Sequence, residues 1–191
     1  MSESALILLA AGSSSRMGAP KQVLDFRRKP LLRHAAEVAV ATGCSPIVVV
    51  LGARATELRP MLANLPVQVV VNDQWSEGIG TSIRAGVRAV ADHPVGAILA
   101  LAYQPFVKPE ALRALVDKHR ETTLPIVASR YEGTVGVPVF FSASLFDTLL
   151  ALEPTQSCKG VILSHAAETL LLDCPDGAID IDTPEDYRNH Q

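Results

Sequence analysis

Residues 5–21 read ALILLAAGSSSRMGAPK, an apolar run that passes directly into a loop of glycine, serine and basic residues. The run at 5–11 is short and apolar on both faces, which is typical of a strand covered by helices on two sides. Comparable runs follow at 47–51, 67–71, 97–101, 126–129 and 137–141. The helix-like segments between them are 31–42, 81–93, 109–121 and 144–153. This alternation predicts an α/β fold with a mostly parallel sheet and helices on both faces.

Local signals mark the ends of several of these helices. Pro30 and Pro109 stand at expected first turns, where a missing N–H is tolerated. Gly43 lies just beyond an expected end, and Ser142 or Ser144 is a candidate N-cap. No internal repeat, low-complexity tract or linker divides the chain, so we expect one domain over residues 1–191.

The composition excludes several classes of protein. Hydrophobic residues make up 48% and charged residues 19%, and the formal net charge is −3, so a basic nucleic-acid-binding face is not expected. No stretch reaches the roughly 18 apolar residues of a membrane span, and the first residues do not resemble a signal peptide. The three cysteines lack CxxC spacing, which favours a reducing compartment and therefore the cytoplasm.

The glycine- and serine-rich loop after the first run has the composition of a phosphate site. Small residues let the main chain approach a ligand closely, and successive N–H groups can bind phosphate oxygens. Arg16 and Lys21 add the positive charge that a triphosphate needs. The loop has neither GxGxxG nor GK[ST] spacing. Its composition alone leaves a polar surface loop as the alternative.

Three longer strings are more specific: LLAAGSSSRMGAPKQVLDF at 8–26, WSEGIGTSIRAGV at 75–87 and IDIDTPEDY at 179–187. Together they resemble the MobA-like nucleotidyltransferases, and most nearly the molybdopterin cytidylyltransferase branch. The resemblance implies a Rossmann-like three-layer sandwich with a mixed, mostly parallel sheet of the nucleotide-diphospho-sugar transferase type. It also implies transfer of a nucleotidyl group, CMP from CTP in that branch, to an acceptor phosphate such as that of molybdopterin. Pyrophosphate is released and Mg²⁺ is the cofactor.

The resemblance also implies roles for individual residues. Arg16 and Lys21 would be the catalytic cations that neutralise the phosphates, and Ser82 would lie near the base. The nucleotide-binding residues would be Leu9, Ala10, Ala11, Gly12, Ser13, Ser15, Arg16, Lys21, Gly80 and Ser82.

The stretch AILALAYQPFV at 97–107 departs from the family pattern, which has a metal-holding aspartate before Gln-Pro. Tyr103 stands at that position, and a phenol with a pKa of about 10 is a poor Mg²⁺ ligand. Asp182, with Asp180 beside it, matches the second metal-facing acid. The alternative for Asp182 is a helix start, with Asp182 or Thr183 as the N-cap before Pro184.

Two further departures lie on the acceptor side. The family's Gly-His-Pro turn reads Gly136-Val137-Pro138, and its Gly-Asp-x-Gly loop reads TQSC at 155–158. Two other functions therefore remain open. One is a nucleotide- or molybdenum-cofactor-binding protein with a degenerate catalytic site, which could hand a cofactor to a molybdoenzyme. The other is a transferase for a different acceptor. Mg²⁺-dependent release of pyrophosphate separates the enzymes from the binding protein.

Overall fold

The fold is built on one large sheet. The computed structural model describes residues 4–14, 20–93 and 95–189. In the large sheet the strands stand in the order β5-β4-β1-β6-β8-β7-β9, and a small sheet pairs β2 (Asp25–Phe26) with β3 (Lys29–Pro30). The strands of the large sheet are β1 (Ala5–Ala10), β4 (Ile47–Leu51), β5 (Gln68–Val71), β6 (Gly96–Leu101), β7 (Ile126–Tyr131), β8 (Thr134–Ser142) and β9 (Thr169–Asp173).

The large sheet is mixed and mostly parallel, as predicted. β1 lies at its centre and pairs in parallel with β4 and β6, while β4 pairs in parallel with β5. β8 is antiparallel to both of its neighbours, and β9 is parallel to β7. All six predicted strands are present. β9 was not predicted, because its sequence TLLLD is rich in leucine, which favours helices more than strands.

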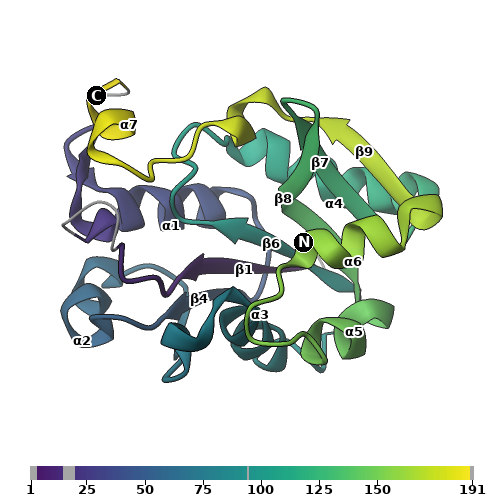
Figure 1. Cartoon of the computed structure of the whole chain (residues 1–191), viewed down its shortest axis with the longest axis horizontal. Coiled ribbons are helices and arrows are strands. Elements are labelled where there is room, and N and C mark those ends of the chain that lie inside the picture. The colour runs from purple at the N-terminus through teal and green to yellow at the C-terminus, as the bar shows by residue number, and fades with distance from the viewer. Residues whose placement is uncertain (1–3, 15–19, 94, 190–191) are drawn as a thin grey trace.

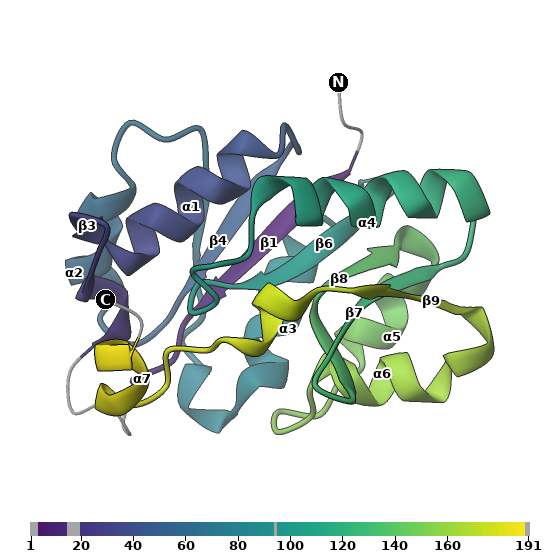
Figure 2. The ribbon, with the colours of Figure 1, turned by 90° about the horizontal axis from the view of Figure 1, so that it is seen from above.

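Helices cover both faces of the sheet and make a three-layer sandwich (Figures 1 and 2). Side chains of α1 and α4 belong to one buried core, and those of α3, α5 and α6 belong to the core on the opposite face. The helices are α1 (Leu31–Ala41), α2 (Ala55–Leu58), α3 (Ile79–Arg88), α4 (Pro109–Thr122), α5 (Phe146–Leu150), α6 (Cys158–Ser164) and α7 (Pro184–Asn189). None of the described helices is long and apolar enough to cross a membrane.

The predicted helix ends are correct for some helices and wrong for others. α4 begins at Pro109, and Gly43 follows α1 with a φ of +76°. Ser142 accepts a hydrogen bond from the Ser144 N–H at the start of the segment that leads into α5. The helix predicted at 81–93 instead ends at Arg88, because its last turns change to i→i+3 hydrogen bonds. The one predicted at 144–153 shortens to α5 after a 3-10 turn.

The C-terminal segment returns across the sheet to the end of β1. After β9 it runs along the carboxyl ends of the central strands and finishes in α7 (Figure 2). The Ile181 N–H donates to the Tyr103 carbonyl, 3.0 Å away, just beyond β6. The sequence motif IDIDTPEDY is thereby brought next to the glycine-rich loop, about 160 residues earlier in the chain.

Candidate nucleotide site

The candidate site lies where the chain direction reverses across the sheet. From β1 the chain builds β4 and β5 on one side, and then crosses to β6 on the other side of β1. The carboxyl ends of β1 and β6 therefore diverge into a crevice, which is where open α/β sheets bind ligands. The glycine-rich loop follows the end of β1 at this crevice, and Tyr103 lies just after the end of β6.

The glycine-rich loop has a buried root and an exposed tip. Leu9, Ala10 and Ala11 are at most 5% exposed, so their side chains pack in the core and only their main chain can contact a ligand. Gly12 and Ser13 are exposed at the crevice. Ser14 is buried with a φ of +60°, and its Oγ accepts a hydrogen bond from the Lys21 N–H at 3.0 Å. The predicted site residues Ser15 and Arg16 lie outside the described residues.

Gln22 joins the loop to the end of β6. Its side chain is 1% exposed, and its amide nitrogen lies 3.1 Å from the Ala10 carbonyl and 2.8 Å from the Gly12 carbonyl. The same nitrogen donates to the Tyr103 hydroxyl at 2.9 Å. Its oxygen accepts a hydrogen bond from Ser14 Oγ at 3.3 Å. Sequence reasoning missed Gln22, although its place directly after Lys21 was a usable signal.

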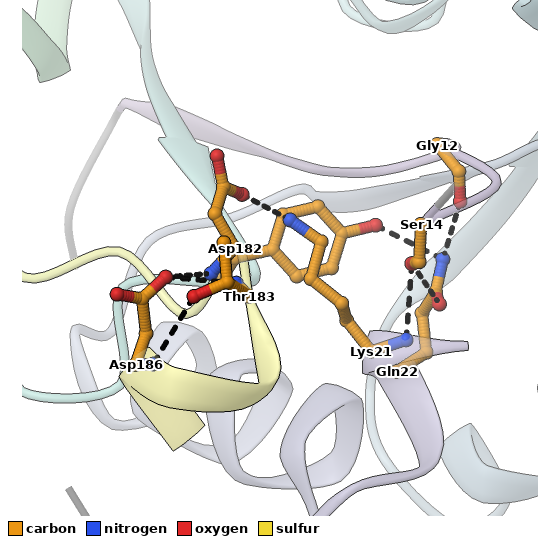
Figure 3. Close-up of polar contacts among 8 residues, drawn as sticks. Gly12, Ser14, Lys21, Gln22, Asp182, Thr183 and Asp186 are labelled. Atoms are coloured by element: carbon orange, nitrogen blue, oxygen red, sulfur yellow. Dashed lines mark hydrogen bonds and ion pairs between the residues drawn. The ribbon is translucent and has the colours of Figure 1, made fainter. Parts of the chain in front are cut away.

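Lys21 contacts both Asp182, as Figure 3 shows, and the ring of Tyr103. Its ammonium group is 4.3 Å from the centre of the Tyr103 ring and forms an ion pair with the Asp182 carboxylate. The Lys21 side chain is 9% exposed and that of Asp182 is 32% exposed. The structure thus brings together three predicted site positions from distant parts of the sequence. Lys21 points at a carboxylate of its own chain.

Asp182 does not form the N-cap of α7. Instead, the Asp186 carboxylate accepts hydrogen bonds from the main-chain N–H groups of Asp182 and Thr183, at 3.0 and 2.8 Å. Thr183 Oγ1 accepts one in return from the Asp186 N–H at 3.2 Å. This reciprocal capping box fixes the start of α7 and leaves the Asp182 carboxylate directed at Lys21 (Figure 3).

Two ionisable groups at the crevice have shifted pKa values. Burial, and then the nearby Asp182 carboxylate, raise the pKa of Tyr103, so its phenol is neutral at pH 7. Burial and the same carboxylate raise the pKa of Asp180 to about 6. Both pKa shifts therefore follow first from burial at the strand ends and second from the charge of the Asp182 carboxylate.

The start of α3 forms the side of the crevice predicted to lie near the base. Asn72, just after β5, donates from its side-chain nitrogen to Thr81 Oγ1 at 2.8 Å and to Ser82 Oγ at 3.0 Å. Gly80 has no room for a side chain, because a Cβ there would lie 2.2 Å from the Glu153 carbonyl. Ser82 is itself buried, and the hydrogen bond from Asn72 holds its hydroxyl. Asn72 was not predicted from the sequence as a site residue.

The two segments that depart from the family pattern on the acceptor side, 136–138 and 155–158, are both in contact with other parts of the site. Gln104, which follows Tyr103, donates to the carbonyls of Gly177 and Val137 at 2.8 and 3.2 Å. Residues 155–157 lie in the connection from α5 to α6, and Cys158 begins α6. The Glu153 and Pro154 carbonyls of this connection leave no room for a Cβ at Gly80 and Gly78. The family's histidine position, Val137, thus lies within β8, whereas its aspartate position, Gln156, lies in the connection that packs against Gly80 of α3.

The carboxylates at the crevice suit a divalent cation in number and kind. Mg²⁺ is commonly held by one or two carboxylates together with phosphate oxygens and water. Asp180 and Asp182 supply two such groups, and their mutual repulsion would be relieved by a cation. No group of three His, Cys, Asp or Glu side chains that could hold a metal occurs in the described part of the chain.

Comparison with known proteins places the chain among nucleotidyltransferases. It is 26% identical to the molybdenum cofactor cytidylyltransferase of Escherichia coli K12 over 184 residues, which cover 95% of this chain and 92% of that protein. It is 37% identical to the nicotine blue oxidoreductase of Paenarthrobacter nicotinovorans over 115 residues. That match covers 60% of this chain and spans 56% of the oxidoreductase.

A solved structure shares the fold over nearly the whole chain. The crystal structure of Rv0371c from Mycobacterium tuberculosis H37Rv superposes with a TM-score of 0.83 at 30% identity, covering 98% of this chain and 97% of that one. A second crystal structure of Rv0371c is a complex with manganese. Residues 6–169 match the model of the MobA-like NTP transferase domain. This chain therefore belongs to the MobA-like NTP transferase family, a family of nucleotidyltransferases with this mostly parallel α/β fold.

Proposed function

We propose that this protein transfers the nucleotidyl group of a nucleoside triphosphate, CTP by preference, to a phosphorylated acceptor such as molybdopterin. The observation that carries the proposal is the exposed Gly12–Ser13 tip of the glycine-rich loop, backed by the buried Lys21, at the diverging ends of β1 and β6. Main-chain N–H groups and a fixed cation are what phosphate recognition requires. The likeness to a cytidylyltransferase over 95% of the chain supports the choice of CTP.

Nucleotidyl transfer asks the protein for positioning and charge neutralisation rather than covalent chemistry. The loop holds the triphosphate, the start of α3 with Ser82 holds the base side, and Arg16 and Lys21 neutralise the phosphates. An oxygen of the acceptor phosphate attacks the α-phosphorus, and pyrophosphate leaves. The acceptor phosphate is already ionised at pH 7, so no general base is needed.

Lys21 changes partner when the triphosphate binds. In the unliganded protein its charge is matched by Asp182. A triphosphate offers a denser negative charge, and Lys21 then turns to it. Asp182, with Asp180 beside it, is thereby released to hold Mg²⁺, which would neutralise phosphate charge and the leaving pyrophosphate.

The assay for the proposal is Mg²⁺-dependent release of pyrophosphate from CTP, GTP, ATP and UTP, with a phosphorylated pterin as acceptor. We expect release with CTP to be fastest. Lys21→Met should weaken CTP binding by about 1.5–3 kcal/mol, the range for hydrogen bonds to charged groups. Lys118→Met is the matched control, because the Lys118 side chain is 43% exposed in the second half of α4, where it pairs with Glu121. Binding that is equal in native protein and Lys21→Met would contradict the assignment of the site.

The replacement of a metal-holding aspartate by Tyr103 favours a second candidate function. This candidate is an oxidoreductase that binds a dinucleotide cofactor, as suggested by the 37% identity to nicotine blue oxidoreductase. The pyrophosphate of a dinucleotide needs the glycine-rich loop but no metal ligand at Tyr103. Binding of NADH or NADPH without Mg²⁺, together with no pyrophosphate release from any triphosphate, would favour it over the transferase.

The cellular compartment and partners complete the proposal. The three cysteines form no disulfide among the described residues, which supports the cytoplasm. If the acceptor is molybdopterin, a molybdoenzyme is the expected recipient of the product.

A further inference from the structure

We infer that the Tyr103 hydroxyl is a positioning group: through Gln22 it holds the main chain of residues 10–14 in the shape that receives the ligand's phosphates. The inference rests on the proposed phosphate site. It assigns to Tyr103 and Gln22 a role in binding that is separate from metal coordination.

Gln22 has more acceptors than its amide has hydrogens. Its two N–H bonds face three oxygens, those of Ala10, Gly12 and Tyr103, at 3.1, 2.8 and 2.9 Å. Two of these oxygens belong to the root and tip of the glycine-rich loop, and the third comes from the neighbouring strand. The orientation of the amide is therefore set jointly by the loop and by the end of β6.

Burial makes this orientation rigid. Gln22 is 1% exposed, so water cannot replace a lost partner. Its oxygen accepts from Ser14 Oγ, and the same Oγ accepts from the Lys21 N–H at 3.0 Å. One connected set of hydrogen bonds thus runs from the Tyr103 hydroxyl to both ends of the loop.

The ring and the hydroxyl of Tyr103 have separable roles. The ring lies beneath the Lys21 ammonium, 4.3 Å from its centre, and that contact needs no hydroxyl. The hydroxyl contacts Gln22 and faces Gly12, where a Cβ would lie 3.8 Å from it. Tyr103→Phe therefore removes the anchor of Gln22 and keeps the packing under Lys21.

A double-mutant cycle of Tyr103→Phe and Gln22→Leu tests the inference in the full-length protein. The first readout is hydrogen exchange of the main-chain amides at 10–14, which needs no ligand. We expect Tyr103→Phe to speed this exchange about tenfold in the native background and less than about twofold in the Gln22→Leu background. The second readout is the Kd for CTP, which should rise about tenfold, or 1.4 kcal/mol, with the same non-additivity.

Tyr131→Phe is the matched control. The Tyr131 hydroxyl is also hydrogen-bonded, but it donates to the Val137 carbonyl in β8, 3.0 Å away, and not to Gln22 or to the described residues of the loop. We expect this control to leave exchange at 10–14 and the Kd for CTP unchanged. If Gln22→Leu does not fold, Gln22→Met replaces it, because methionine adapts to irregular space.

The two readouts separate failure of this inference from failure of the proposed function. If native protein binds no nucleotide, the proposed function fails and hydrogen exchange alone decides the role of Tyr103. Unchanged exchange in Tyr103→Phe would overturn the inference. So would an effect of Tyr103→Phe that persists in full without Gln22, because the hydroxyl would then act by another route.

Discussion

At the scale of single residues, the crevice is organised by charge. Lys21 is a lysine with a 9% exposed side chain, and it lies between an aromatic ring and a carboxylate. A partly buried ion pair adds little to stability on balance, because desolvation offsets the attraction. Holding a cation in a fixed place at the strand ends is a better reason for this pair than stability. Tyr103 completes the arrangement, because its ring lies under the ammonium group at the position where the family pattern has a carboxylate.

Tyr103→Asp tests the position where the family pattern has an aspartate. Without metal, the new carboxylate would repel Asp182 and lower the thermal stability. Mg²⁺ or Mn²⁺ should restore that stability in the variant and change it little in the native protein. A gain of about 2.7 kcal/mol of transition-state stabilisation would raise Mg²⁺-dependent pyrophosphate release roughly a hundredfold.

Tyr103→Asn is the control for this prediction, because it removes the ring without adding charge. A native protein that is already fast, with an aspartate variant no faster, would mean that Tyr103 does not limit metal-dependent chemistry.

Asp180 predicts a dependence of stability on pH. Its carboxyl has a pKa of about 6 in the folded protein against an ordinary value of 3.8, so the folded state binds the proton more tightly than the unfolded chain. This contribution to stability is therefore full below the unfolded pKa and is lost as the pH rises through the folded one. Asparagine in Asp180→Asn stays neutral at every pH, so the variant should match the native protein below pH 3.8 and be more stable above pH 6. Urea unfolding across this interval measures the difference; a difference independent of pH would contradict the expectation.

At the scale of elements, close approach between α3 and the sheet determines where the base side of the crevice lies. Gly86 in α3 touches β1 and β4 so closely that a Cβ would lie 2.4 Å from Ile7 Cγ2 and 3.2 Å from Val50 Cγ2. At the N-terminal end of α3, Asn72 fixes Thr81 and Ser82 to the end of β5. Two contacts, one at each end, thus position the helix against the strand ends.

Gly86→Ala should therefore destabilise the fold. Overpacking of this kind costs about 1–3 kcal/mol, because Ile7 is fully buried and the helix must shift away from β1. Gly160→Ala is the matched control, because Gly160 is also helical and has nothing within 4 Å of an added Cβ. The control should be neutral or more stable by about 0.4–1 kcal/mol. Chemical denaturation compares the two, and equal effects would mean that α3 is not pressed against the sheet.

At the scale of the whole molecule, the site joins distant parts of the fold. The loop after β1, the end of β6 and the segment before α7 meet at Lys21. A ligand that binds here contacts segments from both ends of the sequence, and unfolding must release it. Its binding energy therefore adds to the stability of the entire fold.

CTP should raise the thermal stability more than GTP, ATP or UTP does. A ligand present at about a hundredfold excess over its Kd stabilises the native state by about 2.7 kcal/mol. The comparison of the four triphosphates, each with and without Mg²⁺, is a thermal-shift measurement. A larger shift with GTP would overturn the choice of base and leave membership of the family intact.

The sequence by itself determined the fold class, the central strands and the family. Apolar runs of strand length and helix signals such as Pro109 act over a few residues, so they can be read locally. The strings around Gly12, Gly80 and Asp182 identified the family because close approach of main chain to ligand limits the residue types that fit. The sequence also marked Tyr103 as a departure from the family pattern.

Only the tertiary structure decided what these residues contact. The pairing of Lys21 with Asp182, 161 positions along the chain, depends on the return of the C-terminal segment over the end of β6. The role of Gln22 depends on burial, because its amide can fix the loop only where water is excluded and three oxygens lie within hydrogen-bond distance. The edge strand β9 forms because β7 offers it a partner, whatever its leucines favour locally. Long-range contacts of this kind are set by the packing of the whole chain, and no local pattern encodes them.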